Sequence, residues 1–303
     1  TWTAELPGDR KGLFYTFGIF YDGRWLSETP GVRAKAVGVN GDRAAIVDLR
    51  ETDPEGWEKD LRPPMSSPTD IVIYEMHHRD LSIAPDSGVK HKGKYLALTE
   101  EGTRSAEGLA TGLDHLKELG VTHVHLLPSF DFGSIDESRL QDGVYNWGYD
   151  PKNYFVPEGS YATDPYDPAV RIREFKQMVR SLHRNGIRVV MDAVYNHTHR
   201  TEESNFSLTV PGYYYRHEAD GSFSDATGCG NETASERAMM RRLIVDAVCY
   251  WAEEYHVDGF RFDLMGVHDI GTMNEVRRAL DRIDPSILLY GEGWTAARSP
   301  LDE

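Results

Sequence analysis

The chain has 303 residues, which is long for one ordinary domain, so a large barrel with a smaller added unit is the expected organisation. Asp and Glu number 49 against 33 Lys and Arg, for a formal net charge of −16. A surface this acidic repels phosphate backbones and argues against nucleic acid as the main partner. No run of about 18 apolar residues occurs, so no membrane-spanning segment is expected. The two cysteines, Cys229 and Cys249, neither indicate a disulfide scaffold nor decide the cellular compartment.

Residues 1–50 have the composition of short strands joined by turns. Residues 13–21 and 44–49 favour β-structure, and two dipeptides are typical of hairpin turns, Asp22-Gly23 and Asn40-Gly41. The sequence begins abruptly, without the basic and apolar segments of a signal peptide, and we expect it to be a fragment of a longer protein. The prediction is therefore an incomplete β unit over residues 1–50.

Residues 51–70 are interpreted as a linker. They contain four prolines, Pro54, Pro63, Pro64 and Pro68, which disfavour regular structure. We expect few contacts to cross this segment, as at a domain boundary.

From residue 71 to residue 303, predicted strands alternate with predicted helices. Apolar runs predict strands at residues 71–76, 121–127, 188–195, 257–266 and 287–290. Apolar residues at helical spacing predict helices at residues 109–119, 172–182, 240–251 and 273–283. The spacing Thr233-x-x-Glu236 is that of a capping box and predicts the start of the third helix. Residues 133–168 and 198–232 are predicted to be long loops.

Strands and helices that alternate in this way indicate a parallel sheet. Polar residues stand at the carboxyl end of nearly every predicted strand, among them His77, Asp192, Asp263 and Glu292. That end is the catalytic face of a (β/α)8 barrel. An open, doubly wound sheet is the alternative, but no glycine-rich phosphate loop follows any of the strands. The predicted fold class is α/β, a (β/α)8 TIM barrel of which about strands 1–5 are present.

Asp263 and Glu292 end neighbouring predicted strands, so their carboxyl groups can lie a few Å apart. A pair about 5 Å apart suits retaining glycoside hydrolysis, in which one is the nucleophile and the other the acid/base. Arg261 lies on the same side of its strand as Asp263 and is expected to lower the pKa of Asp263, although a purely structural ion pair is the alternative. Trp294 is expected to form an apolar wall that raises the pKa of Glu292.

The predicted loops supply further candidates for contact with a sugar. Asp192 is followed by Asn196 and His197, and His197 is of a type that donates to sugar hydroxyls; a brace within the loop is the alternative. The stretch YNWGYDP at residues 145–151 holds three aromatic residues, whose flat rings are typical platforms for sugars. Packing within the protein is the alternative for these rings.

Four stretches together resemble motifs of the α-amylase superfamily, glycoside hydrolase family 13. They are YNWGYDP at 145–151, DAVYNH at 192–197, GFRFD at 259–263 and GEGW at 291–294, in the order found in the family. YNWGYDP is similar to the signature of type I pullulanases, the starch-debranching members of that family. Residues 1–50 are similar to the end of the starch-binding β-sandwich, carbohydrate-binding module family 48, which precedes the barrel. Residues 71–303 then correspond to the first part of the catalytic domain.

The resemblance implies retaining hydrolysis of α-1,6 links in pullulan, amylopectin, glycogen or limit dextrins, with a branched α-glucan as the substrate. It implies that Asp263 is the nucleophile and Glu292 the general acid/base. It places four residues around the sugar that is cleaved, namely Asp192, His197, Arg261 and Tyr149. It places Asp150, Trp147 and Trp294 nearby in the cleft, and Asn231 on the leaving side. No cofactor is expected to be required, although acidic loops such as residues 164–167 are of a kind that holds a structural calcium ion.

One motif of the family is not found. Its fourth region is a His-Asp pair after strand seven, whereas this sequence ends soon after the fifth predicted strand. His268-Asp269 follows strand four and is not that pair. We therefore expect that the remainder of the barrel is needed for a complete site and that this chain alone is inactive.

Three other functions remain as alternatives. A metal-dependent hydrolase is suggested by the spacings His123-x-His125 and His197-x-His199, but the first pair falls inside a predicted strand and no third ligand is evident. A non-catalytic glucan-binding protein would not need two opposed carboxyl groups. An amylase or branching enzyme that acts on α-1,4 links shares the general motifs, and YNWGYDP favours debranching.

Overall fold

A parallel β-sheet organises the chain. The computed structural model describes residues 5–297, and within them the sheet has five strands in the order β11-β10-β9-β6-β5. All neighbouring strands in it are parallel, and the strands are β5 (Ile73–Met76), β6 (His123–Leu126), β9 (Arg188–Ala193), β10 (Gly259–Phe262) and β11 (Leu288–Gly291). The strands follow one another across the sheet in chain order, as in the wall of a barrel, whereas the order reverses in a doubly wound sheet. The structure confirms the expected α/β class, with the sheet as part of a (β/α) barrel.

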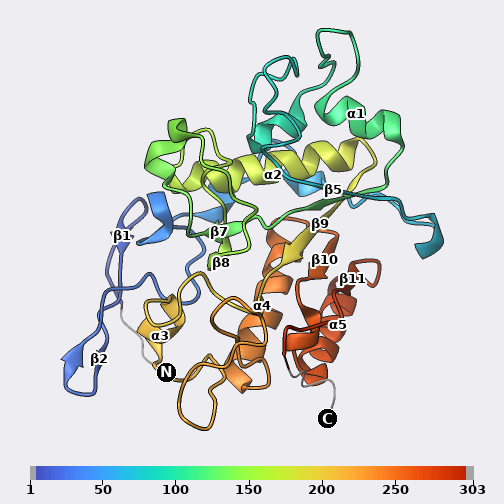
Figure 1. The fold of residues 1–303 in the computed structure, drawn as a ribbon. Coiled ribbons are helices and arrows are strands. Elements are labelled where there is room, and N and C mark those ends of the chain that lie inside the picture. Colours follow the sequence, from blue (N-terminus) through green and yellow to red (C-terminus); the bar gives the residue numbers. More distant parts are fainter. Residues whose placement is uncertain (1–4, 298–303) are drawn as a thin grey trace.

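One helix joins each successive pair of strands (Figure 1). These helices are α1 (Gly112–Leu119), α2 (Pro168–Arg184), α4 (Ala238–Glu254) and α5 (Ile270–Ile283). Their apolar faces are buried against the sheet in one continuous core that includes Leu116, Phe175, Ile244 and Leu280. Gly120 ends α1 in the left-handed conformation, as glycine readily does after a helix. Among the described residues, no helix is both long and apolar enough to cross a membrane.

Three predicted boundaries are wrong. Leu109 is largely exposed and lies before α1, which begins only at Gly112. The capping box does not form, because the Thr233 hydroxyl donates to the Tyr195 carbonyl and Glu236 pairs with Arg216, so that α4 begins at Ala238. The two predicted long loops also contain regular structure. They hold the antiparallel hairpin of β7 (Phe130–Phe132) with β8 (Pro151–Pro157) and the short helix α3 (Asn205–Thr209).

The N-terminal residues form two small antiparallel pairs. One joins β1 (Phe14–Tyr15) to β4 (Ala44–Ala45), and the other joins β2 (Phe20–Tyr21) to β3 (Arg24–Trp25). Asp22 and Gly23 have φ values of 48° and 77°, which confirms the predicted hairpin turn. The strands are shorter than predicted, and the division at residue 50 remains a prediction.

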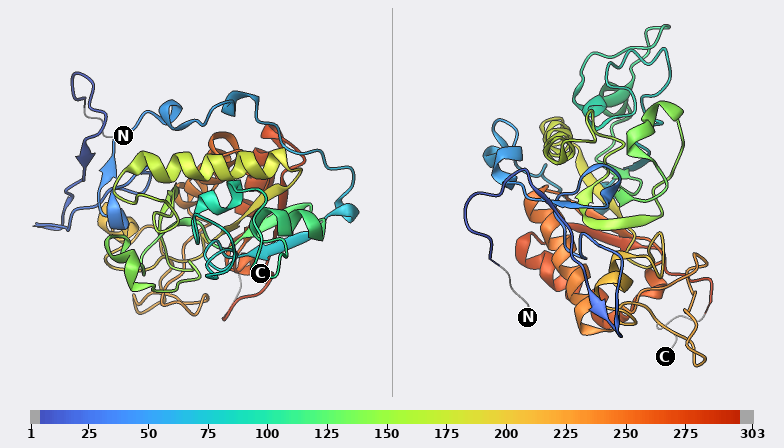
Figure 2. Two further views of the ribbon diagram at one scale, coloured as in Figure 1. Left: turned by 90° about the horizontal axis from the view of Figure 1, so that it is seen from above. Right: turned by 90° about the vertical axis from the view of Figure 1, so that its left-hand side faces the viewer.

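The expectation that few contacts cross residues 51–70 is wrong. The Asp60 side chain is only 2% exposed, and its Oδ2 lies 2.7 Å from His183 Nδ1 and 2.8 Å from His256 Nδ1. Burial alone would lower the pKa of His183, but Asp258 and Asp60 raise it to about 9. Trp57 is buried and stacks on His256 with ring centroids 4.0 Å apart. Figure 2 shows this segment running along the outside of α2. The aromatic and acidic residues between the prolines hold it against the barrel helices.

The Asn40-Gly41 turn fixes the N-terminal β unit to the β7–β8 hairpin. The two residues have φ values of 63° and 73°, which confirms the predicted turn. The Asn40 main-chain N–H donates to Glu137 Oε2 at 2.8 Å, and the Glu137 N–H donates to Asn40 Oδ1 at 2.7 Å. Asn153 Nδ2 donates to the Gly41 carbonyl at 3.0 Å, and Lys152 Nζ donates to the Asn40 carbonyl at 2.7 Å.

The turn rests on a buried charge cluster that consists of Arg171, Asp131, Glu137 and Glu158. Arg171 is fully buried and pairs with Asp131 Oδ1 at 2.9 Å and with Glu137 Oε2 at 2.7 Å. Buried charges are tolerated only when they are paired in this way. The turn therefore docks on carboxylates that a buried guanidinium holds in place.

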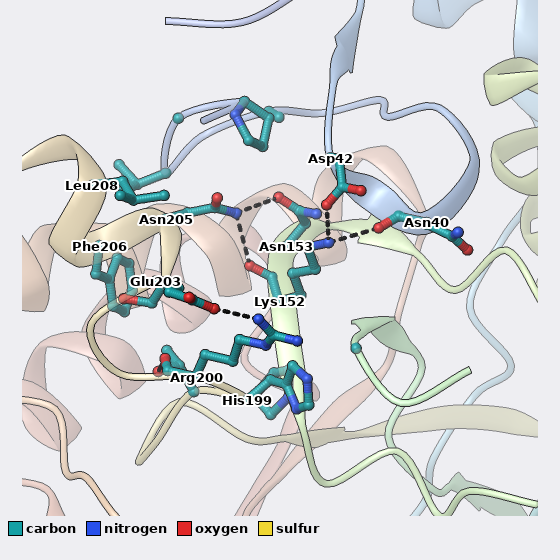
Figure 3. Close-up of a pocket in the computed structure, with 18 of the residues that line it drawn as sticks. Asn40, Asp42, Lys152, Asn153, His199, Arg200, Glu203, Asn205, Phe206 and Leu208 are labelled. Carbon is teal, nitrogen blue, oxygen red and sulfur yellow. Dashed lines mark hydrogen bonds and ion pairs between the residues drawn. The ribbon is translucent and has the colours of Figure 1, made fainter. Parts of the chain in front are cut away.

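A cavity of about 820 Å³ lies beside this contact, between the N-terminal unit and the loops that surround α3 (Figure 3). Its amide side chains already bond to protein groups: Asn205 Nδ2 donates to Asn153 Oδ1 at 2.9 Å, and Thr29 donates to Asn205 Oδ1 at 2.9 Å. The described residues that line the cavity do not include Asp263 or Glu292. The cavity is therefore separate from the strand ends considered below.

We predict that Gly41→Ala destabilises the fold by about 2 kcal/mol or more, because the new Cβ would meet Asp131 Oδ2 and Asn153 Nδ2 at a position with positive φ. Gly23→Ala is the matched control, since Gly23 has φ +77° and no heavy atom within 4 Å of an added Cβ. Denaturant unfolding of both variants measures the difference. Equal losses would show that the docking contact contributes nothing beyond backbone strain.

Candidate active site

The register of the sheet brings the acidic strand ends together. Arg261 in β10 stands opposite Asp192 in β9 and opposite Tyr290 in β11. Asp263 follows β10 directly, and Glu292 follows β11 directly. Parallel neighbouring strands place their carboxyl ends at one edge, so these side chains meet there.

The guanidinium group of Arg261 binds three carboxylates at once. Its Nη1 lies 3.0 Å from Asp192 Oδ1 and 2.9 Å from Asp263 Oδ1, and its Nη2 lies 2.5 Å from Glu292 Oε1. A planar guanidinium has donors enough for several such bonds. The two predicted catalytic carboxyl groups, those of Asp263 and Glu292, are therefore held on one side chain.

Burial controls the pKa of Asp263 and raises it to about 6, although the hydrogen bond from Asn196 and the charge of Arg261 both lower it. The predicted lowering by Arg261 is therefore present, but the burial of the side chain and the negative charge of Asp192 outweigh it. Asp263 is a base that titrates near neutrality.

Glu292 does not face the predicted apolar wall. Its Oε1 pairs with Arg261, and its Oε2 accepts a hydrogen bond from the Leu264 main-chain N–H at 3.2 Å. Trp294 is 56% exposed. The surroundings of the Glu292 carboxyl group are thus ionic and polar.

The backbone turns sharply directly after Asp263. Leu264, directly after Asp263, has φ 41°, a left-handed conformation that is rare for a branched side chain. Strained backbone of this kind is typical of functional sites, where neighbouring contacts hold it in place. Here the bond from the Leu264 N–H to Glu292 is one such contact.

Tyr149 and two residues outside the predicted set complete the site. The Tyr149 hydroxyl donates to Asp192 Oδ2 at 2.9 Å, and burial together with the Asp192 charge raises the pKa of Tyr149. His125 Nε2 lies 3.2 Å from the same Oδ2. Asn196 Nδ2 donates to Asp263 Oδ2 at 2.9 Å. The sequence offered His125 only as half of the His123-x-His125 spacing, because a histidine within a barrel strand can point either to the helices or to the barrel interior.

Other predicted residues lie in or near the loops but are bonded within them. Asp150 accepts from Asn146 Nδ2 at 2.8 Å and from Ser134, so it braces the 145–151 loop. Asn231 is buried, and its amide bonds both the N–H and the carbonyl of Thr198. Trp147 is 60% exposed and, like Trp294, is available to a ligand.

His197 is also fully engaged by protein groups. Its Nδ1 lies 2.5 Å from Asn196 Oδ1, and its Nε2 lies 2.8 Å from the Tyr149 carbonyl. These contacts brace the loop through Asn196 and Tyr149, and the sugar contact of His197 stays a prediction.

The described acidic groups suit a metal ion poorly. Asp164 and Asp167 are exposed, and each accepts a hydrogen bond from a main-chain N–H two residues later. The one group of carboxylates close enough to share an ion, among residues 5–297, is Asp131, Glu137 and Glu158. Arg171 already supplies the positive charge there. The paired histidines do not converge either, because His125 contacts Asp192 and His197 contacts Asn196 and Tyr149.

Comparison with known proteins agrees with this geometry. Residues 76–217 match the family described as alpha amylase, catalytic domain. A pullulanase of Bacillus subtilis is 49% identical over 300 residues, which cover 99% of this chain and 41% of the relative. A solved pullulanase of Paenibacillus barengoltzii in complex with maltohexaose and alpha-cyclodextrin has 58% identity and a TM-score of 0.93, covering 96% of this chain and 46% of that one.

Residues 76–217 of this chain belong to the α-amylase family. Within that family, the chain is similar to pullulanases from plants as well as bacteria, since the chloroplastic pullulanase 1 of Arabidopsis thaliana is 40% identical over 347 residues. The chain spans less than half the length of these relatives, 41% and 35% respectively. The similarity covers the N-terminal unit as well as the partial α-amylase barrel.

We predict that Arg261→Met lowers the free energy of unfolding by about 3 kcal/mol at pH 7, because it leaves buried carboxylates without their partner. The loss should be smaller at pH 5, where Asp263, whose pKa is about 6, takes up a proton. Arg242→Met is the control, since Arg242 is exposed and its pair with Asp246 lies on the helix surface. A loss that is independent of pH, or equal in both variants, would contradict the role of Arg261.

Proposed function

We propose that the protein containing this chain is a retaining glycoside hydrolase that cleaves α-1,6 branch links of pullulan, amylopectin, glycogen or limit dextrins. The observation that carries the proposal is the pair of carboxylates, Asp263 and Glu292, held on Arg261 at adjacent strand ends. The YNWGYDP stretch and the similarity to pullulanases favour branch links over α-1,4 links. The substrate class is therefore a branched α-glucan.

Asp263 is the proposed nucleophile. Its carboxylate attacks the anomeric carbon while the bond from that carbon to the leaving oxygen breaks, which gives a glycosyl–enzyme ester. Burial beside Asn196 and Arg261 leaves the carboxylate poorly hydrated and fixed in direction. A pKa of about 6 keeps it ionised at neutral pH and makes it a stronger nucleophile than an acid of ordinary pKa.

Glu292 is the proposed general acid and base. It gives its proton to the leaving oxygen in the first step and takes a proton from water in the second, so that the acid is restored and the configuration is retained. Arg261 lies between the two carboxyl groups and stabilises negative charge on whichever of them is ionised. Asp192 and Tyr149, joined by a hydrogen bond, are proposed to contact the sugar that is cleaved.

This chemistry uses side chains alone and requires no cofactor. The proposal concerns the full-length protein, because the chain covers 41% of the Bacillus subtilis relative and 46% of the Paenibacillus barengoltzii one. A further carboxylate from the remainder of the barrel is proposed to complete the site.

We predict that kcat/KM on pullulan falls about tenfold per pH unit as the pH is lowered below about 6, because Asp263 must be ionised to attack. Asp263→Asn should lower the rate by about 1,000-fold or more. The exposed Asp281→Asn is the control and should keep the wild-type rate. Maltotriose should be the product.

Wild-type activity of Asp263→Asn would rule out the nucleophile. Products other than maltotriose would instead point to α-1,4 cleavage. Binding of the glucan without turnover by the full-length protein would support the non-catalytic alternative.

A further inference from the structure

A chain of hydrogen bonds joins residues 51–70 to the amino end of the sheet. His183, in the last turn of α2, lies between two carboxylates. Its Nδ1 is 2.7 Å from Asp60 Oδ2, and its Nε2 is 2.8 Å from Asp258 Oδ2. Asp60, His183 and Asp258 together form a histidine clamp, and their side chains are at most 2% exposed.

The two carboxylates fix the protonation state of His183. An ionised carboxylate only accepts hydrogen bonds, so each ring nitrogen must carry a proton. Asp258 Oδ2 also accepts from the Val189 main-chain N–H at 2.7 Å, and Asp60 Oδ2 also accepts from His256 Nδ1 at 2.8 Å. Both oxygens are thus acceptors for two donors each. His183 is therefore an imidazolium ion between two carboxylates.

Asp258 connects the clamp to three strands of the sheet. Its main-chain N–H donates to the Val189 carbonyl in β9 at 2.8 Å, and its carbonyl accepts from the Leu288 N–H in β11 at 2.8 Å. Asp258 also precedes β10 directly, and β10 contains Arg261. The clamp therefore joins residues 51–70 to the strands whose other ends form the candidate site.

Other contacts of the same segment do not involve a histidine between carboxylates. Asp53 Oδ1 lies 2.5 Å from the buried Lys176 Nζ, and Arg62 Nη2 donates to the Ala252 carbonyl at 2.6 Å. The ordinary pKa values of lysine and arginine lie above about 10, whereas that of histidine is about 6.5. The clamp is thus the contact of this segment that is expected to respond to pH just above neutrality.

Charged groups from every neighbouring element face the clamp. They are Lys59 and Arg62 in the segment, Arg180 and Arg184 in α2, Arg188 in β9, His123 in β6 and His256 before β10. Burial lowers the pKa of His183, but hydrogen bonds and charge from Asp258 and Asp60 raise it to about 9. Burial also acts to raise the pKa of Asp60, but His183 and His256 lower it, so Asp60 stays ionised. A rise in pH therefore removes a proton from His183.

We propose that the histidine clamp is a pH-sensitive fastening, which holds residues 51–62 to the amino end of the sheet at neutral pH and weakens as the solution becomes alkaline. Loss of the proton leaves one ring nitrogen without a hydrogen against a carboxylate, and leaves two buried carboxylates without a cation between them. A histidine whose pKa is raised on folding contributes stability that is complete below about pH 6.5 and is lost as the pH rises through about 9.

Hydrogen–deuterium exchange of the full-length protein, followed by mass spectrometry, tests the proposal. The readout is the protection factor of the main-chain amides of residues 51–62, in which the observed exchange rate is divided by the intrinsic rate at each pH. We expect protection to fall at least about tenfold between pH 7 and pH 9 and to be level above about pH 9.5, whereas peptides of α5 show no such change. Constant protection of residues 51–62 from pH 7 to pH 10, or an equal fall in α5, would overturn the proposal.

Asp60→Asn and Asp53→Asn form a matched pair of variants, since each replaces a carboxylate of the segment by an amide of the same shape. Asp60→Asn removes one of the two negative charges on His183, so the fall in protection should end at lower pH by about one unit or more. Asp53→Asn weakens the pair with Lys176, so protection should be lower by a similar factor at every pH and the fall should still end near pH 9.

The same pH dependence in both variants would show that Asp60 has only a structural role, and it would overturn the proposal. The wild-type measurement needs no substitution, so it tests the proposal even if Asp60→Asn does not fold.

Discussion

The guanidinium group of Arg261 is the contact on which the strand-end site depends. Three carboxylates from neighbouring strands would repel one another at this edge, and two of them, Asp192 and Asp263, are buried. Without a shared cation, burial of that much negative charge would cost more than the surrounding packing contributes. Arg261 holds the three carboxylates in place, and their different surroundings suit them to different proposed roles.

A second buried guanidinium, Arg171, has the same role in the support of the site. It neutralises Asp131 and Glu137 beneath the Asn40-Gly41 turn, and so it fixes the N-terminal unit to the β7–β8 hairpin. Loop 145–151 lies between these two hairpin strands. The loop is therefore held by the hairpin and by Tyr149, whose hydroxyl donates to Asp192 and whose carbonyl lies 2.8 Å from His197 Nε2. Both anchors restrict the loop that carries the aromatic residues expected to meet substrate.

The order of strands and helices could be predicted because apolar periodicity is local and strong. Turns at Asp22-Gly23 and Asn40-Gly41 could be predicted because few residues adopt positive φ easily. The start of α4 could not, since Thr233 bonds Tyr195, a residue far away in the sequence. The contacts of Asp60 with His183 and His256 join residues that are still further apart in the sequence.

The motifs identified the residues that meet at the strand ends. The motifs did not reveal the pKa shifts of those residues. The sign of the Asp263 pKa shift depends on burial and on Asp192, and neither is visible in the spacing of Arg261 and Asp263. The contacts of the two His197 ring nitrogens with Asn196 and Tyr149 were not visible in the sequence either, and its contact with a sugar stays a prediction. His125 was recognised only as a possible metal ligand, because nothing in the sequence shows that it reaches Asp192 in the neighbouring strand.

We propose that Asp263 forms the covalent bond to the sugar. Incubation of the full-length protein with a slowly hydrolysed, fluorinated maltotriosyl fluoride, followed by proteolysis and mass spectrometry of the peptides, tests this role directly. We expect one added glycosyl group, on the peptide that contains residues 259–263 and at the Asp263 carboxylate, with release of fluoride. An adduct on Glu292 or on Asp192, or turnover with inversion and no adduct at all, would contradict it.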